Sequence, residues 1–283
     1  MVFQLKKISN HGTGNPIVAR LTIQLIDLLK FSFLGKEKED ALGTDFMALH
    51  QRLLRCFVIL TQLEENLAKS KQECDENSKI QKDPRVRQVP FVPQLEQLAE
   101  NFLYESKNFL RDLAFIIGKF HNEKFNEASN FCNLKDPTKL SLVQAWFKSK
   151  YGDKEWIVAV LQADKSWLYE IMSKRNASEH PGGYSGVLKI INVALDANQE
   201  VIAPAWHRGN YPPTSIFNDM RTCIENLLSF AEDMIIFGCI TKKLPIAISI
   251  VDLPESKRRP ENPVRFYAGS DPEGKTFYFD KAS

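Results

Sequence analysis

Residues 45–67 read DFMALHQRLLRCFVILTQLEENL, and this stretch decides the fold class. Apolar side chains recur in it every three or four positions, which is the spacing of one face of an α-helix. They are Phe46, Leu49, Leu53, Cys56, Phe57, Leu60, Leu63 and Leu67. The pattern predicts a long helix that buries one side.

A second long helix is predicted over residues 93–121, where Leu95, Leu98, Phe102, Phe109, Leu113, Ile116 and Phe120 share one face. The residues between the two helices are polar. Residues 69–88 read KSKQECDENSKIQKDPRVRQ and predict a loop and a candidate boundary. Two long helices joined by a polar loop favour an antiparallel pair at the centre of a helical bundle.

Shorter elements are predicted on both sides of this pair. A strand is expected over residues 2–8, and a helix is expected between the capping residue Asn15, with Pro16 at its first position, and Gly35. Residues 36–40 read KEKED and predict a charged surface connection. Further helices are expected after Ser141, from Asp153 to Arg175, over 185–196 and over 215–237, with residues 199–214 irregular.

The C-terminal residues have a different pattern. Ile246, Ile248 and Ile250 alternate with smaller residues, and the stretches 264–267 and 276–279 are separated by the turn residues 271–274. The sequence therefore predicts a mostly α protein, a bundle around two long antiparallel helices with a small C-terminal β-hairpin or meander. The expected domains are a strand and helix extension (1–44), a helical domain (45–240) and a β-rich element (241–283).

Composition limits the possible functions. The chain has 283 residues, 43% apolar and 25% charged, which is typical of a globular protein, and its net charge of +2 argues against nucleic-acid binding through a broad basic surface. No apolar run approaches the roughly 20 residues of a membrane span, and no leader is expected. The five cysteines form no CxxC pair, which predicts a reducing, cytoplasmic compartment. We expect no metal and no cofactor, because no HExxH, GxSxG or GxxxxGK[ST] motif is present.

Residues 175–180 read RNASEH and carry the main functional prediction. On an unbroken helix the side chains of Arg175 and His180 point roughly 140° apart. Pro181 disfavours helical geometry at His180, so the two side chains can converge where the helix ends. A neutral histidine can move a proton to or from a ribose or phosphate ester oxygen, and a guanidinium can grip a phosphate with two hydrogen bonds. Asn176 adds an amide that can orient either partner.

This segment resembles the active-site motif of the HEPN superfamily, an arginine, a polar residue, three variable residues and a histidine. The resemblance implies a compact helical bundle and a metal-independent endoribonuclease acting in toxin–antitoxin or antiviral defence. It implies Arg175 and His180 as the catalytic pair, with Asn176 as the polar neighbour. It also implies a homodimer, because two motifs typically face each other, and an antitoxin or sensor protein as a further partner of an RNA-cutting enzyme.

Other residues are weaker candidates. Trp206, His207 and Arg208 lie in a loop-like stretch and, with Lys174, are predicted to contact RNA if they lie near Arg175. His50 and His121 are expected to be structural, His11-Gly12-Thr13-Gly14 is only a fragment of a phosphate loop, and Lys257-Arg258-Arg259 is a short basic run. Alternative readings stay open: an ordinary helix end in which Arg175 pairs with Glu179, a non-catalytic RNA- or nucleotide-binding module, or a helical protein-interaction module.

Overall fold

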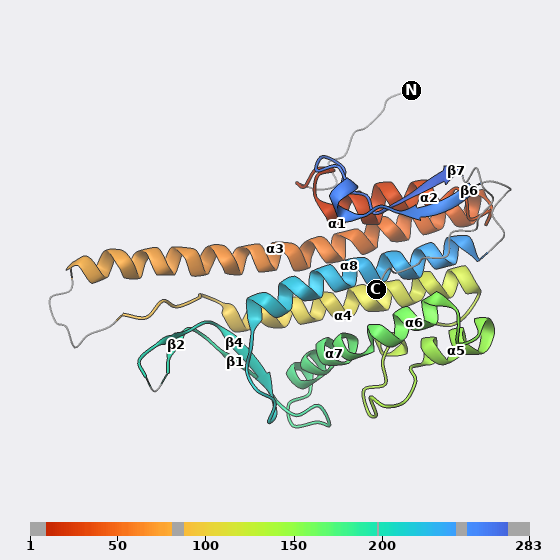
Figure 1. Ribbon diagram of the computed structural model, residues 1–283. Helices are drawn as coiled ribbons and strands as arrows, with labels where there is room; N and C mark the ends of the chain where they lie inside the picture. The colour runs from red at the N-terminus through yellow and green to blue at the C-terminus, as the bar shows by residue number, and fades with distance from the viewer. Residues whose placement is uncertain (1–9, 81–87, 197, 242–247, 271–283) are drawn as a thin grey trace.

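The computed structural model describes residues 10–80, 88–196, 198–241 and 248–270, with the backbone alone for residues 79, 80, 248, 249 and 270. The fold is mostly α, as the sequence predicts. The helices α3 (Lys36–Ile80) and α4 (Leu95–His121) run antiparallel along each other, and α8 (Ile216–Ile240) packs against both (Figure 1). The strand predicted over residues 2–8 lies outside the described residues.

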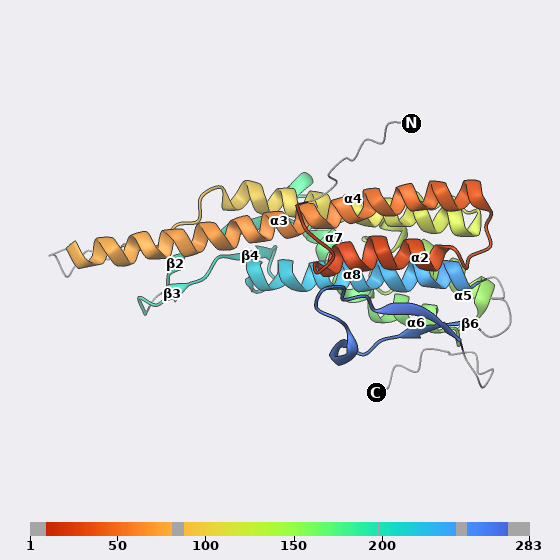
Figure 2. The same ribbon diagram turned by 90° about the horizontal axis from the view of Figure 1, so that it is seen from above.

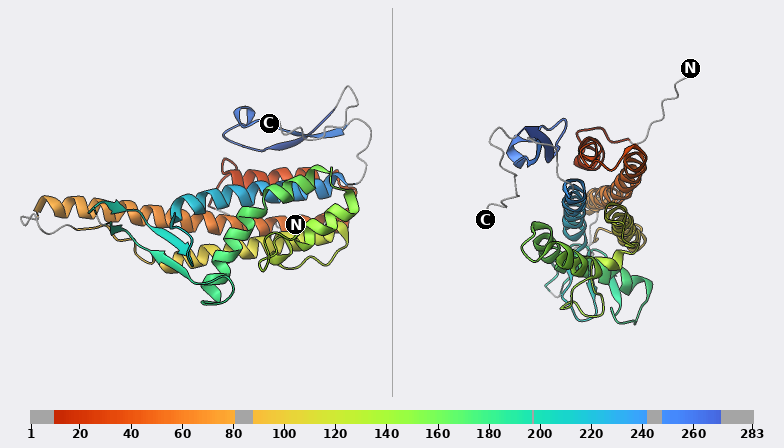
Figure 3. Two further views of the ribbon diagram at one scale, coloured as in Figure 1. Left: turned by 60° about the horizontal axis from the view of Figure 1, so that its bottom comes forward. Right: turned by 90° about the vertical axis from the view of Figure 1, so that its right-hand side faces the viewer.

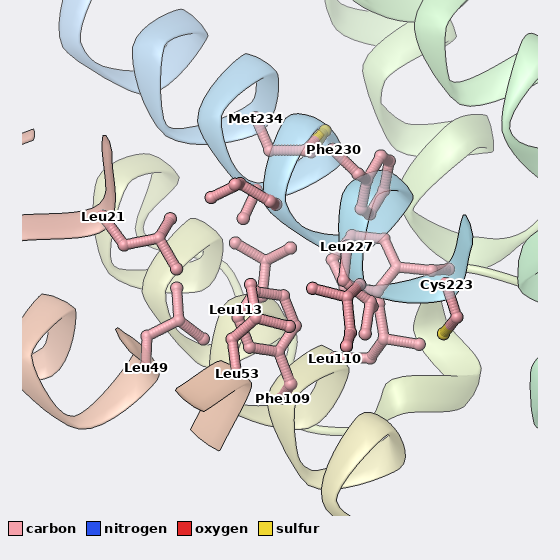
Figure 4. Close-up of a cluster of buried hydrophobic side chains, with 14 of the residues drawn as sticks. Leu21, Leu49, Leu53, Phe109, Leu110, Leu113, Cys223, Leu227, Phe230 and Met234 are labelled. Atoms are coloured by element: carbon pink, nitrogen blue, oxygen red, sulfur yellow. The ribbon is translucent and has the colours of Figure 1, made fainter. Parts of the chain in front are cut away.

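The core forms where these three helices meet the N-terminal helix, which comprises α1 (Pro16–Val18), the π-helical turn η1 (Ala19–Gln24) and α2 (Leu25–Leu29). Figure 4 shows buried side chains from all four meeting at one point, among them Leu21, Leu53, Leu113 and Leu227. Leu21, Leu53 and Phe266 of the C-terminal strand belong to one continuous apolar cluster. The three predicted domains therefore share a core, although their boundaries stay a prediction.

The long helix α3 extends beyond its predicted limits at both ends. Residues 36–40 form its first turn rather than a connection, because no proline or helix-breaking pair interrupts them and Lys36 forms an ion pair with Asp40 one turn later, at 2.8 Å. The predicted loop at 69–88 is helical as far as Ile80, since its lysine, glutamine and glutamate residues favour helix. This distal part carries polar residues all round because it projects beyond α4 and α8 (Figure 1).

The N-terminal helix has the cap that the sequence predicts, and the helix expected after Ser141 is present. Ile17 N donates to Asn15 Oδ1 (2.9 Å) with Pro16 in the first turn, and Gln144 N donates to Ser141 Oγ (3.1 Å) at the start of α5 (Leu142–Tyr151). The helix expected from Asp153 is instead two helices. α6 (Trp156–Ala163) begins after Glu155, and α7 (Lys165–Glu179) begins after Asp164, which ends one helix and precedes the next.

The helix predicted over residues 185–196 is wrong. These residues form β1 (Leu188–Ile191) and β2 (Ala194–Leu195), and the stretch predicted to be irregular contains β3 (Val201–Ile202), β4 (Ala205–Arg208) and β5 (Thr214–Ser215). β4 pairs antiparallel with β1 and β5, and β2 pairs with β3. The alternating burial of β1 fits a pleated strand, and pairing with β4 outweighs the apparent helical spacing of its isoleucines.

The C-terminal β element is a hairpin of β6 (Ile248–Asp252) and β7 (Phe266–Ser270), antiparallel and in register from Ile248–Ser270 to Asp252–Phe266. The 3₁₀ turn η3 (Glu255–Lys257) lies in the connection, and a second such turn, η2 (Ala128–Asn130), follows α4. The strand predicted at 276–279 lies outside the described residues. Figures 2 and 3 show the hairpin beside the N-terminal helix and α8, with α5, α6 and α7 on another side of the bundle.

Candidate functional site

The RNASEH segment forms the C-terminal end of α7. The helix ends at Glu179, and His180 leaves it with non-helical backbone angles (φ −129°, ψ 70°) while its N–H still donates to the Asn176 carbonyl (2.9 Å). Pro181 follows, and a turn closes with Gly183 N donating to the His180 carbonyl (3.0 Å). The helix therefore ends between Arg175 and His180, as the proline predicts.

Arg175 and His180 converge on the same carboxylate. The Arg175 guanidinium pairs with Glu179 Oε2, and His180 Nε2 lies 3.6 Å from that oxygen. Their exposure differs, because the Arg175 side chain is 11% exposed and the His180 side chain 66%. Burial lowers the pKa of Arg175 from its usual value, and the neighbouring Tyr104 acts in the opposite direction.

Two residues of α4 complete this group. The guanidinium carbon of Arg175 lies 5.9 Å from the centre of the Tyr104 ring, and Lys107 Nζ lies 3.6 Å from Glu179 Oε2. Burial lowers the pKa of Lys107, and the nearby positive charge of Arg175 adds to this effect. Tyr104 is half exposed. We call Tyr104, Lys107, Arg175, Glu179 and His180 the motif face. Sequence reasoning missed its two α4 members, because nothing in one-dimensional spacing indicates that α4 contacts α7.

Asn176 points away from this carboxylate. Its amide Nδ2 donates to Ser185 Oγ (2.9 Å), and Ser185 is buried. Ser178, also on α7, donates to Glu100 Oε1 of α4 (2.9 Å). In this arrangement Asn176 fixes the turn after the helix, and through that turn it holds His180 in place. A direct contact with a phosphate remains a prediction.

The four residues predicted to contact RNA lie together, but in a separate cleft. Lys174, Trp206, His207 and Arg208 line a cavity of about 500 Å³ between α7, α8 and β4. Lys174 is buried, and its ammonium group bonds Asp219 Oδ2 (2.9 Å) and lies 3.2 Å from Glu170 Oε1. Burial alone would raise the pKa of Asp219, but hydrogen bonds from Thr214, Trp206 and Lys174 outweigh burial and lower it.

Arg208 is as deeply buried in this cleft as Lys174. Its Nη1 donates to the Ser185 carbonyl (3.2 Å), its Nη2 contacts Glu170 Oε2 (3.4 Å), and its guanidinium lies over the Tyr211 ring (4.6 Å). Within the described chain its buried Nε has no hydrogen-bond partner. His207 is half-buried, with Nδ1 3.2 Å from the Gly209 carbonyl. The uncharged polar residues Asn218, Thr222 and Asn226 of α8 line the opposite wall.

The remaining histidines have structural surroundings. His50 is buried with Nδ1 2.6 Å from the Met47 carbonyl, and burial lowers its pKa. His121 lies among aromatic rings, and burial lowers its pKa to about 4. In the part of the chain that the structure describes, no group of three or more histidine, cysteine or acidic residues is placed to hold a metal ion, and no helix has the length and apolar character of a membrane span.

The predicted site residues thus form two groups on different sides of α7, the motif face and the cleft, joined through Ser185. Arg175 and His180 belong to the first group, and Lys174, Trp206, His207 and Arg208 to the second. Comparison with known proteins finds no matching family model, no similar characterised protein and no similar solved structure.

Proposed function

We propose that this chain is a metal-independent endoribonuclease of the HEPN type, a toxin or phage-defence effector that acts as a cytoplasmic homodimer. The observation that supports it best is the convergence of Arg175 and His180 on one carboxylate at the end of α7. Four residues of sequence lie between them, yet the helix end brings both to a single small patch. Acid–base catalysis on a phosphate needs this arrangement of a proton carrier beside a fixed cation.

The roles follow from the chemistry of each side chain. In one direction of proton transfer, His180 takes the proton of a ribose 2′-hydroxyl, whose oxygen attacks the adjacent phosphorus. The bond to the 5′-oxygen breaks and that oxygen gains a proton, so the products are a 2′,3′-cyclic phosphate and a 5′-hydroxyl. Arg175 stabilises the negative charge that grows on the phosphate oxygens. Tyr104, half exposed beside Arg175, offers a ring on which a base can stack.

Glu179 holds Arg175 in the free protein. A phosphate must displace this carboxylate to reach the guanidinium, so the free chain is a resting form. One chain supplies one Arg/His pair, and the second pair of a HEPN-type site comes from another copy. His180 and the residues that follow it are exposed, which leaves this end of α7 open to a second copy and to RNA. An antitoxin or sensor protein that shifts Glu179 would control the enzyme.

A second candidate is an RNA- or nucleotide-binding module that cuts nothing. The cleft between α7, α8 and β4 favours it, because aromatic walls, two asparagines and the nearly buried cations Lys174 and Arg208 can hold a base and its phosphate. Its charged pairs are complete without any ligand, with Lys174 on Asp219 and Arg208 on Glu170. This candidate needs no role for His180, which separates it from the first.

The test is cleavage of mixed cellular RNA in EDTA by the wild type and by the variants His180→Ala and Arg175→Ala. Arg55→Ala is the control, because it removes a surface arginine outside the motif face. Arg55 is exposed and pairs with Glu105, away from His180. We expect the wild type and Arg55→Ala to produce fragments with 2′,3′-cyclic phosphate ends, and the other two to be inactive. Cleavage of RNA by His180→Ala would contradict the proposal. Binding without cleavage by a dimeric wild type would favour the second candidate.

A further inference from the structure

Two segments that carry weak phosphate-binding patterns in the sequence lie next to each other in the fold. The turn at residues 11–14 precedes the N-terminal helix, and the basic run 257–259 lies in the connection between β6 and β7. Thr13 Oγ1 donates to the Glu261 carbonyl (3.0 Å), and a Cβ atom on Gly14 would lie only 3.2 Å from the Pro260 carbonyl oxygen. The two segments are therefore packed directly against each other.

Four arginines line the cavity beside this junction, namely Arg20 of η1, Arg221 of α8, Arg258 and Arg265. Arg20 is fully engaged, because it pairs with the buried carboxylate of Glu232 and its Nη2 contacts Ser229 Oγ (3.3 Å). Arg265 is engaged too, with ion pairs to Asp233 (3.0 Å) and Asp252 (3.1 Å). Arg221 pairs with Glu64, so carboxylates engage three of the four arginines, and Asp164, Glu225 and Glu255 also line the cavity.

Arg258 differs from the other three arginines of the cavity. Its Nε donates to the Leu253 carbonyl (3.0 Å), which fixes the direction of the guanidinium. Its ion-pair contact, from Nη2 to Asp252 Oδ1, is 3.9 Å long and too distant for a hydrogen bond. Burial lowers the pKa of Arg258, and the positive charge of Arg20 lowers it further, partly offset by Asp252. Among the described residues, its Nη groups therefore have donors to spare and face added positive charge.

The cavity extends from Arg258 along a groove with both polar and apolar walls. It has a volume of about 1130 Å³ and runs between the N-terminal helix, α3, α8 and the connection from β6 to β7. Its walls include the apolar side chains of Ile17, Phe57, Leu60, Ile224 and Leu228. The groove is thus larger than the usual 300–1,000 Å³ of small-molecule sites, so a ligand need fill only part of it.

The π-helical turn η1 shapes the charged end. Residues four apart lie on one face of this turn, and both Arg20 Nε and Gln24 Nε2 donate to Glu232 Oε1 (2.9 and 2.7 Å). Gln24 Oε1 in turn accepts from the backbone N–H of Arg265 and Phe266 (2.6 and 2.7 Å). This buried network holds the β6–β7 connection, and with it Arg258, against the groove.

We propose that this groove binds a small amphipathic anion, with a phosphate or carboxylate group on Arg258 and an apolar body against the side chains of α1, α3 and α8. The guanidinium matches the oxyanion with two parallel donors, and the apolar walls match the body. The site lies apart from the motif face, so it stands whether or not the chain cleaves RNA. It also assigns a ligand contact to Arg258 within the basic run 257–259.

The test is calorimetric titration of the full chain with octyl phosphate, octanoate and inorganic phosphate, below micellar concentrations, with octyl glucoside as the uncharged probe. We expect octyl phosphate or octanoate to bind, inorganic phosphate to bind more weakly, and octyl glucoside to bind most weakly. Shorter alkyl phosphates should lose affinity by about fourfold for each methylene that the groove no longer buries. The two octyl anions distinguish a phosphate from a carboxylate ligand.

The neighbouring arginine provides a matched control. Arg259 is exposed and does not line the groove, whereas Arg258 does. Arg258→Gln should weaken the better octyl anion by roughly tenfold or more, the loss of a charge-assisted hydrogen bond, while Arg259→Gln should leave its affinity unchanged. Arg258→Lys keeps the charge and serves if the glutamine variant does not fold. No binding of either octyl anion at millimolar concentration, or equal binding by wild type and Arg258 variants, would overturn the proposal.

Discussion

Asn176 and Arg208 donate hydrogen bonds to the same residue, Ser185. Asn176 Nδ2 reaches the Ser185 hydroxyl (2.9 Å), and Arg208 Nη1 reaches its carbonyl (3.2 Å). Ser185 is buried in the turn that follows the RNASEH segment, and so it joins the end of α7 to the cleft between α7, α8 and β4. A change at either group can therefore reach the other through one residue.

Replacing Ser185 with alanine tests this connection. The variant loses the hydroxyl acceptor of Asn176 and keeps the carbonyl that Arg208 uses, so we expect a loss of about 1 kcal/mol in the free energy of unfolding. We also expect slower RNA cleavage, because the turn that carries His180 is less fixed. Urea denaturation and a cleavage time course measure the two effects. Ser178→Ala, which removes a more exposed hydroxyl bonded to Glu100, is the control and should change neither.

Glu179 should restrain the proposed enzyme. In Glu179→Gln the Arg175 guanidinium is no longer neutralised, so we expect RNA to bind two- to fivefold more tightly, about 0.5–1 kcal/mol for a partly exposed ion pair. Fluorescence anisotropy with a short labelled RNA measures this affinity, in the His180→Ala background so that the RNA stays intact. Glu100→Gln, on the neighbouring α4, is the control. Weaker binding by the Glu179 variant would show that this carboxylate helps to hold RNA instead.

The sequence predicts the end of α7 and misses what surrounds it. Pro181 and the polar turn after it are visible in the sequence, and they suffice to place His180 outside the helix. Lys107 lies more than sixty residues before Arg175, and only the packing of α4 on α7 brings it to Glu179. The strands β1 and β4 were missed for a similar reason. The apolar residues of 188–193 fit helical and strand spacing alike, and the pairing partner that decides between them lies elsewhere in the chain.

The limits of α3 show a different gap between sequence and structure. Apolar periodicity marks the buried part of a helix and not its full length. The periodic part ends near Leu67, yet the helix continues to Ile80 with residues that favour helix without packing. The β6–β7 hairpin was readable from alternation at 246–250, but its partner strand begins at Phe266 rather than at Val264.

His121 should make the fold sensitive to acid. Burial lowers the pKa of its imidazole to about 4 in the folded chain, with Lys150 adding to the shift, against 6.5 for the free group. Above pH 6.5 neither state is protonated. Between pH 6.5 and 4 the unfolded chain takes up a proton that the folded chain does not, so the free energy of unfolding falls, by up to about 3 kcal/mol. Buried His50, with a pKa lowered by burial, acts in the same direction.

The variant His121→Phe fits an aromatic ring among Trp146, Phe147 and Phe237 and removes the titrating group. We expect urea denaturation at several pH values to give a shallower loss of stability from pH 6.5 to 4. Tyr151→Phe is the control, because it removes the hydroxyl that lies 3.3 Å from His121 Nδ1 and leaves the imidazole in place. An unchanged slope in His121→Phe would assign the acid sensitivity to other groups.

Two helical glycines should respond to alanine in opposite directions. A Cβ atom at Gly238 of α8 would lie 2.7 Å from the Phe120 ring of α4, so Gly238→Ala should destabilise the bundle by about 1–3 kcal/mol. At Gly43 of α3 nothing lies within 4 Å of the added atom, so Gly43→Ala should stabilise the fold by up to about 1 kcal/mol through helix propensity. The urea midpoints of the two variants measure this difference. A Gly238→Ala variant as stable as the wild type would show that α4 and α8 are not in close contact at this point.

The two halves of α3 differ in local stability, because the distal half is polar. Up to about Leu63 the helix is held by the core, whereas over residues 71–78 only Cys74 is buried. An isolated helical segment of this length is marginal in water. Amide hydrogens near Leu49 and Leu53 should therefore exchange with solvent only when the whole protein unfolds, while those beyond residue 70 exchange through local opening. The same helix then contains both the slowest and some of the fastest exchanging amides of the bundle. Limited proteolysis within the helices should therefore begin in the part of α3 beyond residue 70.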